Sequence, residues 1–210
     1  MIRLRVSGRR LIGRSLLLVG TLAALTPVSG TAQDPLLDRH ESLLEPRIST
    51  LKGERVLVVT ATGDPNLVGP AAFGLLFQLY FSIPETPKGL ALPPPRARWP
   101  EDLETPKDRW VGRYAMIVPT GVSELPSHQP PEGLQASLTE WEYGEVAEIL
   151  HVGPYDQEQP TVQRLHEFVR ANGYVTVGDH EEEYLRGPTM TGPGDPEKYL
   201  TILRYRVEKP

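Results

Sequence analysis

The sequence of 210 residues contains no cysteine. Disulfide bonds, thiolate nucleophiles, thiolate–zinc sites and a lipid anchor on an N-terminal cysteine are therefore excluded. A Gly-x-Ser-x-Gly motif, a phosphate-binding loop and a dinucleotide-binding fingerprint are also absent, so the common enzyme classes lack sequence support. The 5 histidines include no helical i, i+4 pair and no His-x-His. We therefore expect neither a metal ion nor another cofactor.

The N-terminal region lacks acidic residues and reads as a targeting segment. Residues 1–32 contain five arginines, then the apolar run 16–25, then the small residues Gly30 and Ala32. This order is typical of a signal peptide cleaved after Ala32, and the apolar run is short for a membrane span. An uncleaved N-terminal anchor is the alternative. We therefore expect residues 1–32 to be a signal peptide and the protein to be exported, to the periplasm or the extracellular space.

The remaining part of the chain is poor in basic residues. Subtracting the five leader arginines from 22 Lys and Arg leaves 17, against 27 Asp and Glu, a net charge of about −10. Binding to phosphate backbones relies on clustered Lys and Arg, so we expect no nucleic-acid partner. No later segment is long and apolar enough to cross a membrane, so we expect no stable insertion after cleavage. The length after cleavage suits one domain.

The first half of that domain follows a polar N-terminal arm at residues 33–52. The β-branched segment 54–61 predicts a strand, and the apolar positions after Pro70 predict a helix that ends near Tyr80. The proline-rich segment 84–106 predicts an extended loop with at most an edge strand at 96–99. The aromatic and β-branched segment 110–118 predicts a further strand.

The second half repeats this order. It predicts a strand at 144–152, a Gly-Pro turn, a helix at 161–171, a strand around 182–185 and a closing strand at 199–207. Val56 and Gly63 precede Val146 and Gly153 by 90 positions. We therefore predict an α+β fold of duplicated β-α-β-β modules, 53–120 and 140–208, with a pseudo-twofold axis. Its antiparallel sheets carry two helices on one side, and a ligand cleft lies between the halves.

The acidic run 181–183, at the strand predicted around 182–185, supplies a candidate site. A strand alternates its faces, so Glu182 and Tyr184 should point one way while Glu181 and Glu183 point the other. A carboxylate beside an aromatic ring suits a cationic or polarised organic ligand. The alternative is a solvated edge strand, in which Glu182 is as exposed as its neighbours.

Three further aromatic residues are candidate walls of this site. Tyr155 follows the rigid Gly153-Pro154 turn, while Trp110 and Tyr114 lie in the predicted strand of the first half. Each would also serve as an ordinary core residue, which is the commoner role of a single buried aromatic side chain. The site prediction therefore requires that these rings converge with Glu182.

Two motifs carry a family resemblance. HVGPYDQ at 151–157 and EEYL at 182–185 resemble the GyrI-like small-molecule-binding domain family, over roughly residues 52–207. The resemblance implies duplicated modules that bind organic, often cationic or aromatic, compounds in the cleft between them, with Glu182 facing the ligand. Some stand-alone members hydrolyse reactive electrophiles with that glutamate. The export signal and the proline-rich segment 84–106 depart from the family, and export argues against gyrase inhibition and transcriptional sensing.

Three functional hypotheses follow. The first is an exported binding protein that takes a hydrophobic or cationic aromatic molecule between its modules, with Glu182, Tyr184, Tyr155, Trp110 and Tyr114 as ligand-binding residues. The second is a hydrolase of small electrophiles in which Glu182 is catalytic, which would require burial of its carboxyl group. The third is an interaction protein of the cell envelope. A related heme-binding fold is more remote, because no motif places a histidine as an axial ligand.

Overall fold

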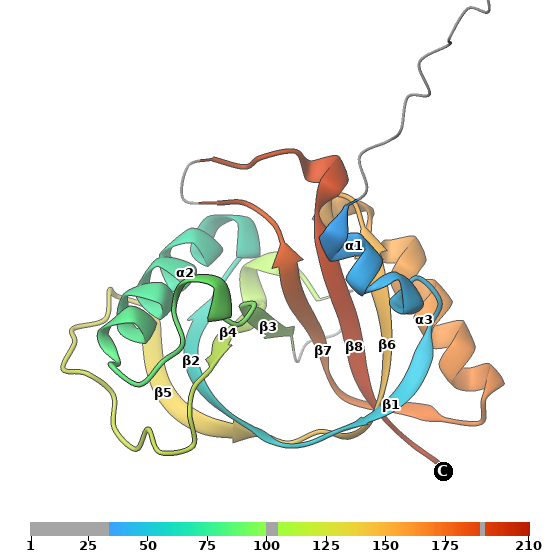
Figure 1. Cartoon of the computed structure of the whole chain (residues 1–210), viewed down its shortest axis with the longest axis horizontal. Coiled ribbons are helices and arrows are strands. Elements are labelled where there is room, and N and C mark those ends of the chain that lie inside the picture. Colours follow the sequence, from blue (N-terminus) through green and yellow to red (C-terminus); the bar gives the residue numbers. More distant parts are fainter. Residues whose placement is uncertain (1–33, 100–104, 190–191) are drawn as a thin grey trace, which may run out of the picture. The chain divides into compact units, whose positions relative to one another are not determined.

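The structure is a computed structural model that describes residues 34–99, 105–189 and 192–210, so the predicted signal peptide lies outside the described residues. A single antiparallel sheet of eight strands, in the order β1-β6-β8-β7-β3-β4-β2-β5, organises the domain (Figure 1). The strands are β1 (Arg47–Leu51), β2 (Glu54–Thr62), β3 (Arg96–Trp99), β4 (Val111–Ile117), β5 (Leu134–Trp141), β6 (Gly144–Val152), β7 (Val175–Arg186) and β8 (Leu200–Glu208). The α-helices are α1 (Pro35–Arg39), α2 (Pro65–Ser82) and α3 (Gln159–Ala171).

Each half of the sheet has the same connection. The first half runs β2-α2-β3-β4 and the second runs β6-α3-β7-β8, and the two halves meet where β3 pairs with β7. The predicted α+β class and antiparallel pairing are therefore confirmed. The two halves share one order of strands and helix, which agrees with an internal duplication. The duplication itself stays a prediction.

The helices α2 and α3 cover one face of the sheet. Alternate residues of β2, Leu57 and Val59, pack in one core cluster with α2, and Ala147 and Ile149 of β6 pack in a second with α3. On β7, Glu182 pairs with Ala97 of the first cluster on one side and with Leu203 of the second on the other. Because paired residues project to the same side of a sheet, both helices share the face of Glu182.

The helix α2 begins earlier than the sequence predicted. The Asp64 carboxylate accepts a hydrogen bond from the backbone N–H of Asn66, and Pro65 occupies the first turn, where its missing N–H is no loss. Pro70 consequently lies inside the helix rather than at its start. None of the helices in the described residues is long and apolar enough to cross a membrane.

Strand β3 is central, although its proline-rich surroundings predicted at most an edge strand. It pairs with β4 on one side and with β7 on the other, and so joins the two halves. The prediction was wrong because the flanking prolines lie outside the four residues that form the ladder, which leaves the N–H groups of 96–99 free to pair.

Two strands lie in segments where the sequence predicted none. Part of the expected arm, 47–51, forms β1 and pairs with β6 at one edge of the sheet. Residues 134–141 form β5, which pairs with β2 at the other edge. Both strands are half-exposed, so their hydrophobic signal is weak, and they owe their conformation to the ladder of a neighbour.

Candidate functional site

Glu182 lies at the centre of the sheet, where the two halves join. The residue is 8% exposed and its strand is central, so the alternative of a solvated edge strand is wrong. The indole N–H of Trp99 donates a hydrogen bond of 2.7 Å to Glu182 Oε1. Among the described residues, no arginine or lysine forms an ion pair with this carboxylate. A buried carboxylate without an arginine or lysine partner is costly, and it marks the position as a candidate binding site.

Aromatic rings surround Glu182, and we call them the aromatic cluster. Trp99 packs against Trp110 and Tyr114, with ring centroids 5.6 and 5.5 Å apart. Phe73 of α2 links Tyr114 at 4.9 Å to Tyr184 at 5.8 Å, and Tyr184 in turn lies 5.5 Å from Tyr155. The members are Phe73, Trp99, Trp110, Tyr114, Tyr155 and Tyr184.

The structure therefore gathers all five residues predicted from the sequence. Tyr114 is fully buried, whereas Tyr155, Tyr184 and Trp110 are partly exposed, so the cluster reaches the surface at these three rings. Trp99 and Phe73 hold the group together, and the sequence prediction omitted both. In a central strand at 96–99, Ala97 and Trp99 lie on one face and Arg98 on the other. Recognition of β3 as a central strand would therefore have indicated Trp99 as a residue of the site.

Two glycines make room for the rings. A Cβ at Gly112 would lie 2.7 Å from atoms of both Trp99 and Tyr114, so only glycine lets these rings meet over β4. A Cβ at Gly187 would lie 2.3 Å from the hydroxyl oxygen of Tyr155. The glycine at 187 therefore sets how closely Tyr155 approaches the end of β7.

The phenols near Glu182 stay protonated. Burial, followed by the charge of Glu182, raises the pKa of Tyr114 to about 12 and shifts the pKa values of Tyr155 and Tyr184 upward as well. The cluster thus presents neutral rings beside the Glu182 carboxyl group, and this combination suits a cation through the carboxyl oxygens and the ring faces together.

Two further polar residues, absent from the sequence prediction, lie beside Glu182. Glu158 occupies the N-cap position of α3, but its side chain accepts no capping hydrogen bond. Burial, with a further contribution from Glu182, raises the pKa of Glu158 to about 9. His180, two residues before Glu182, is 4% exposed, and its Nε2 lies 3.5 Å from Glu182 Oε1. One atom from each of Glu158, His180 and Glu182 lies within 4.8 Å of the others, which makes them candidate metal ligands.

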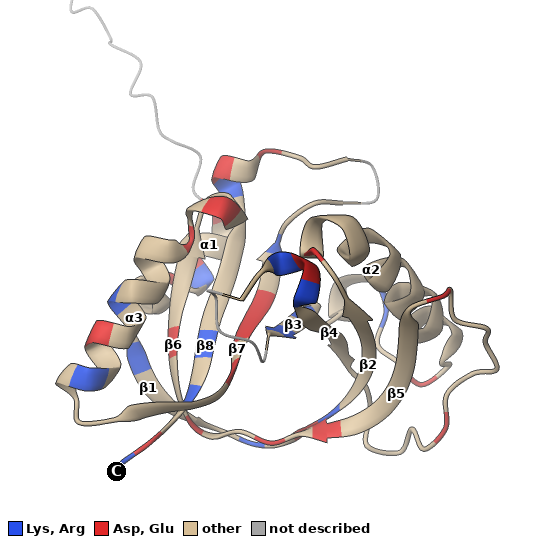
Figure 2. Cartoon of the chain, turned by 180° about the vertical axis from the view of Figure 1, so that it is seen from behind, with Lys and Arg blue, Asp and Glu red and all other residues tan. Residues whose placement is uncertain are grey.

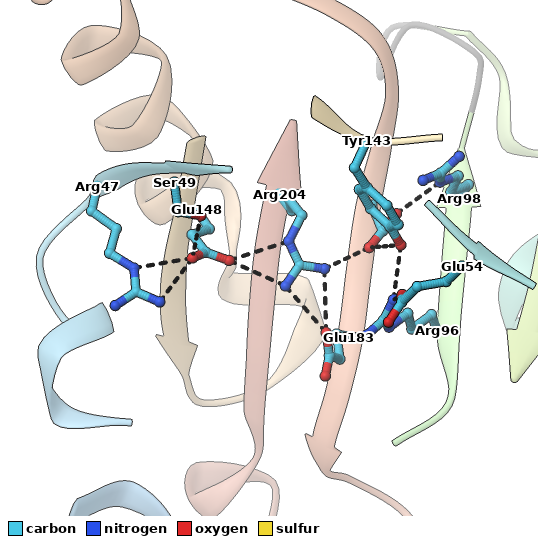
Figure 3. Close-up of polar contacts among 10 residues, drawn as sticks. Arg47, Ser49, Glu54, Arg96, Arg98, Tyr143, Glu148, Glu183 and Arg204 are labelled. Atoms are coloured by element: carbon cyan, nitrogen blue, oxygen red, sulfur yellow. Dashed lines mark hydrogen bonds and ion pairs between the residues drawn. The ribbon is translucent and has the colours of Figure 1, made fainter. Parts of the chain in front are cut away.

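The opposite face of the sheet carries the neighbouring glutamates in a different environment. Arg204 of β8 donates to Glu181 at 2.6 Å, and to Glu183 and Glu148 at 3.2 Å each (Figure 3). Arg98 donates to Glu181 at 2.7 Å. Figure 2 shows the acidic stretch of β7 between basic positions on β3 and β8. We call this set the arginine–glutamate network: Arg47, Arg96, Arg98, Arg204, Glu54, Glu148, Glu181 and Glu183.

The network balances four guanidinium groups with four carboxylates. Burial opposes ionisation of Glu148 and Glu181, but Arg204 and the other arginines hold the pKa of each carboxyl below its usual value. Tyr143 completes the network, because it accepts a hydrogen bond from Arg96 and donates one to Glu181. These glutamates are therefore structural, and their charges are already neutralised.

Two hollows open on the network face. One of about 340 Å³ is lined by residues of β1, β3, β6 and β8 together with the segment after α1, and one of about 110 Å³ lies beside Arg98 and Tyr143. None of the five predicted site residues lines either hollow. The larger hollow is lined by residues of both halves. It is therefore a second candidate ligand site, and experiments must distinguish it from the aromatic cluster.

Comparisons with solved structures show proteins of the same fold. An uncharacterized conserved protein from Listeria innocua superposes with a TM-score of 0.62 at 22% identity, covering 82% of this chain and 98% of that one. A hydrolase from Listeria innocua superposes with a TM-score of 0.59 at 20% identity and the same coverage. EcmrR in a complex with DNA superposes with a TM-score of 0.55 at 16% identity, covering 83% of this chain and 62% of that one.

Because EcmrR is bound to DNA in that structure, the comparisons do not support the expectation that this chain has no nucleic-acid partner. That expectation stays a prediction. No curated protein matches the chain by sequence. Residues 44–203 match the family described as GyrI-like small molecule binding domain. That match covers most of the chain and includes both halves of the sheet, the aromatic cluster and Glu182. The chain belongs to the GyrI-like small molecule binding domain family.

Proposed function

We propose that this protein is an exported binding protein that takes a hydrophobic or cationic aromatic small molecule at the aromatic cluster, with Glu182 as its charge partner. One observation carries the proposal: Glu182 is a buried carboxylate with a Trp99 N–H donor but no arginine or lysine partner among the described residues. A cationic ligand would supply the missing charge, and the partly exposed rings of Tyr155 and Tyr184 would supply apolar contact.

The proposal is tested by pairing ligands of equal shape and different charge. Phenyltrimethylammonium and tert-butylbenzene differ in one atom, nitrogen or carbon, and therefore in charge alone. We expect the cation to raise the melting temperature of the wild-type protein more than the neutral compound does. In Glu182→Gln the advantage of the cation should disappear, whereas Glu208→Gln, which removes an exposed carboxylate, should retain it. Equal stabilisation by both ligands in the wild type would contradict the role of charge.

The larger hollow on the opposite face gives this test a second arm. A ligand bound there would contact Lys52 and Arg47 rather than Glu182. Lys52→Gln and Tyr155→Leu therefore separate the two places. Loss of ligand stabilisation in Lys52→Gln, with Tyr155→Leu unaffected, would move the binding site to the network face.

Export is tested separately from binding. The proposal rests on the five arginines, the apolar run and Ala32 of residues 1–32. Expression of the full chain in a Gram-negative host should yield a periplasmic product whose N-terminal residue is Gln33. Recovery of the unprocessed chain in the cytosol would contradict export without touching the ligand proposal.

A second candidate function is hydrolysis of a small electrophile, with Glu182 activating water or stabilising developing positive charge. The burial of Glu182 favours it, since general-base work at neutral pH requires a carboxyl group shielded from solvent. The Listeria innocua hydrolase shares the fold. Turnover of an epoxide such as styrene oxide by the wild type, lost in Glu182→Gln, would support this function. Binding without turnover would leave the first proposal alone.

A further inference from the structure

We propose that Glu158, His180 and Glu182 bind a divalent transition-metal ion. The three side chains come from the N-terminal end of α3 and from the centre of β7, so tertiary structure alone brings them together. One ligand-type atom from each lies within 4.8 Å of the others. Ligand atoms of a tetrahedral site with bonds of about 2.0–2.2 Å are about 3.5 Å apart. The His180 Nε2 to Glu182 Oε1 distance of 3.5 Å already fits, and Glu158 would close in slightly.

Polar atoms without hydrogen-bond partners provide the second, independent observation. His180 Nε2 and Glu158 Oε2 are both buried, and neither has a hydrogen-bond partner in the described part of the protein. His180 is more than nine-tenths buried, and its Nε2 faces the carboxylate of Glu182. Buried polar atoms are nearly always hydrogen-bonded, so two such atoms beside one carboxylate indicate a missing ligand.

The remaining contacts of the site orient two of its ligands. His180 Nδ1 lies 2.8 Å from the Tyr205 hydroxyl. With the Nδ1 proton donated to Tyr205, Nε2 carries the lone pair and faces the site. The Trp99 indole donates to Glu182 Oε1 and fixes that carboxylate from the other side. Metal-binding histidines and carboxylates are commonly held by such outer hydrogen bonds.

The charge and chemistry of the donors select the class of ion. Two carboxylates and one neutral imidazole carry a charge of −2 when the ligands are deprotonated, which a divalent cation balances. The imidazole nitrogen favours zinc and its neighbours over magnesium and calcium, which prefer oxygen ligands alone. Three protein ligands leave a fourth position for water or for an atom of a bound molecule.

This inference goes beyond the proposed function and shares one residue with it. Glu182 belongs to both, so a metal ion and an organic cation would compete for the same carboxylate. His180 and Glu158 belong to the metal proposal alone, and the Tyr155 ring to the organic-ligand proposal alone. Variants of these residues therefore distinguish failure of one proposal from failure of the other.

The experiment is a titration of the purified protein after treatment with EDTA. Isothermal titration calorimetry with ZnCl₂ should show one saturable site per chain, with weaker binding of MgCl₂ and CaCl₂. We expect Glu158→Gln and His180→Gln each to weaken zinc binding at least about tenfold. His128→Gln removes a histidine of the loop between β4 and β5, outside the site, and should bind zinc like the wild type. Tyr155→Leu should also bind zinc like the wild type.

A Co²⁺ absorption spectrum supplies the check on geometry. Visible d–d bands of the wild type with Co²⁺, lost in Glu158→Gln, would support coordination by this residue. Circular dichroism and metal-free melting curves identify any variant that does not fold, and the isosteric Glu158→Gln keeps the test available if His180→Gln fails. Absence of a one-to-one site in the wild type, or equal affinity of Glu158→Gln and His128→Gln, would overturn the proposal.

Discussion

The two faces of β7 place neighbouring glutamates in opposite electrostatic environments. Glu181 and Glu183 face the arginine–glutamate network, where Arg98, Arg96 and Arg204 pair with them. Glu182, on the helix-covered face, receives a hydrogen bond from Trp99 and has Glu158, a second carboxyl group, nearby. All three glutamates are buried, so burial alone does not separate them. The arginine partners separate them. A carboxylate paired with arginine stabilises the fold, whereas a carboxylate without an arginine partner is available to a ligand.

The largest effect is expected from removing the central cation of the network. Arg204→Met leaves Glu148, Glu181 and Glu183 without their shared guanidinium, and breaking a buried ion pair in this way costs about 3–5 kcal/mol. Urea denaturation measures the change in the free energy of unfolding. The matched variant Arg206→Met, two residues along the same strand and exposed, should cost less than about 1 kcal/mol. Similar losses in both variants would contradict a structural network.

The comparison of adjacent glutamates is sharpest when each is made neutral. Glu181→Gln removes the carboxylate that Arg98 and Arg204 share and should destabilise the protein by about 3 kcal/mol. Glu182→Gln keeps an oxygen for the Trp99 N–H and removes a buried charge, so its free energy of unfolding should stay within about 1 kcal/mol of the wild type. The reverse order of the two variants would break the distinction between the faces.

Acid should weaken the network before it unfolds the rest of the protein. The pKa values of Glu148 and Glu181 are lower in the folded state than their usual value of 4.5, because arginines surround them. The unfolded chain therefore takes up protons first as the pH falls through about 4.5, and the contribution of these carboxylates to stability is lost below that pH. Urea unfolding at pH 3 to 7 measures the loss. A Glu148→Gln variant should show a shallower pH dependence, and an unchanged one would count against the assignment.

A packing change on the helix-covered face should have a smaller effect on stability. The added Cβ of Gly112→Ala would overlap Trp99 and Tyr114, and overpacking of this kind costs about 1–3 kcal/mol. Thermal unfolding reports the loss, and near-ultraviolet circular dichroism reports whether the rings have moved. Gly74→Ala, in α2 with open space around its Cβ, is the control and should not destabilise the protein. An unchanged aromatic spectrum in Gly112→Ala would show that the cluster tolerates the methyl group.

The smallest effect on stability is expected at the outer end of the cluster. In Gly187→Ala the new methyl group would displace the Tyr155 hydroxyl, which is the far end of that side chain. We expect a loss below about 1 kcal/mol, together with weaker stabilisation by tetraphenylphosphonium in a thermal-shift assay. Gly121→Ala, between β4 and β5 with open space at its Cβ, is the comparison for the effect on ligand binding. Equal ligand responses in both variants would remove Tyr155 from the site.

Local sequence patterns determined much of the framework. The β-branched and apolar runs located β2, β4, β6, β8 and the main part of both long helices, because burial of one face imposes a period on the sequence. Strand alternation also assigned Glu182 and Tyr184 to one face and Glu181 and Glu183 to the other. The network contacts on one side and the Trp99 contact on the other confirm this assignment.

Only the tertiary structure decided what each of these glutamates meets. The sequence treats Glu181, Glu182 and Glu183 as one acidic run, and nothing local distinguishes a carboxylate that has an arginine partner from one that has none. The distinction arises when β3 inserts between β4 and β7, which carries Arg96 and Arg98 to one face and Trp99 to the other. Strand alternation sets the direction of each side chain, but the β3 partners of Glu181 and Glu182, Arg98 and Trp99, lie 83 residues away along the chain.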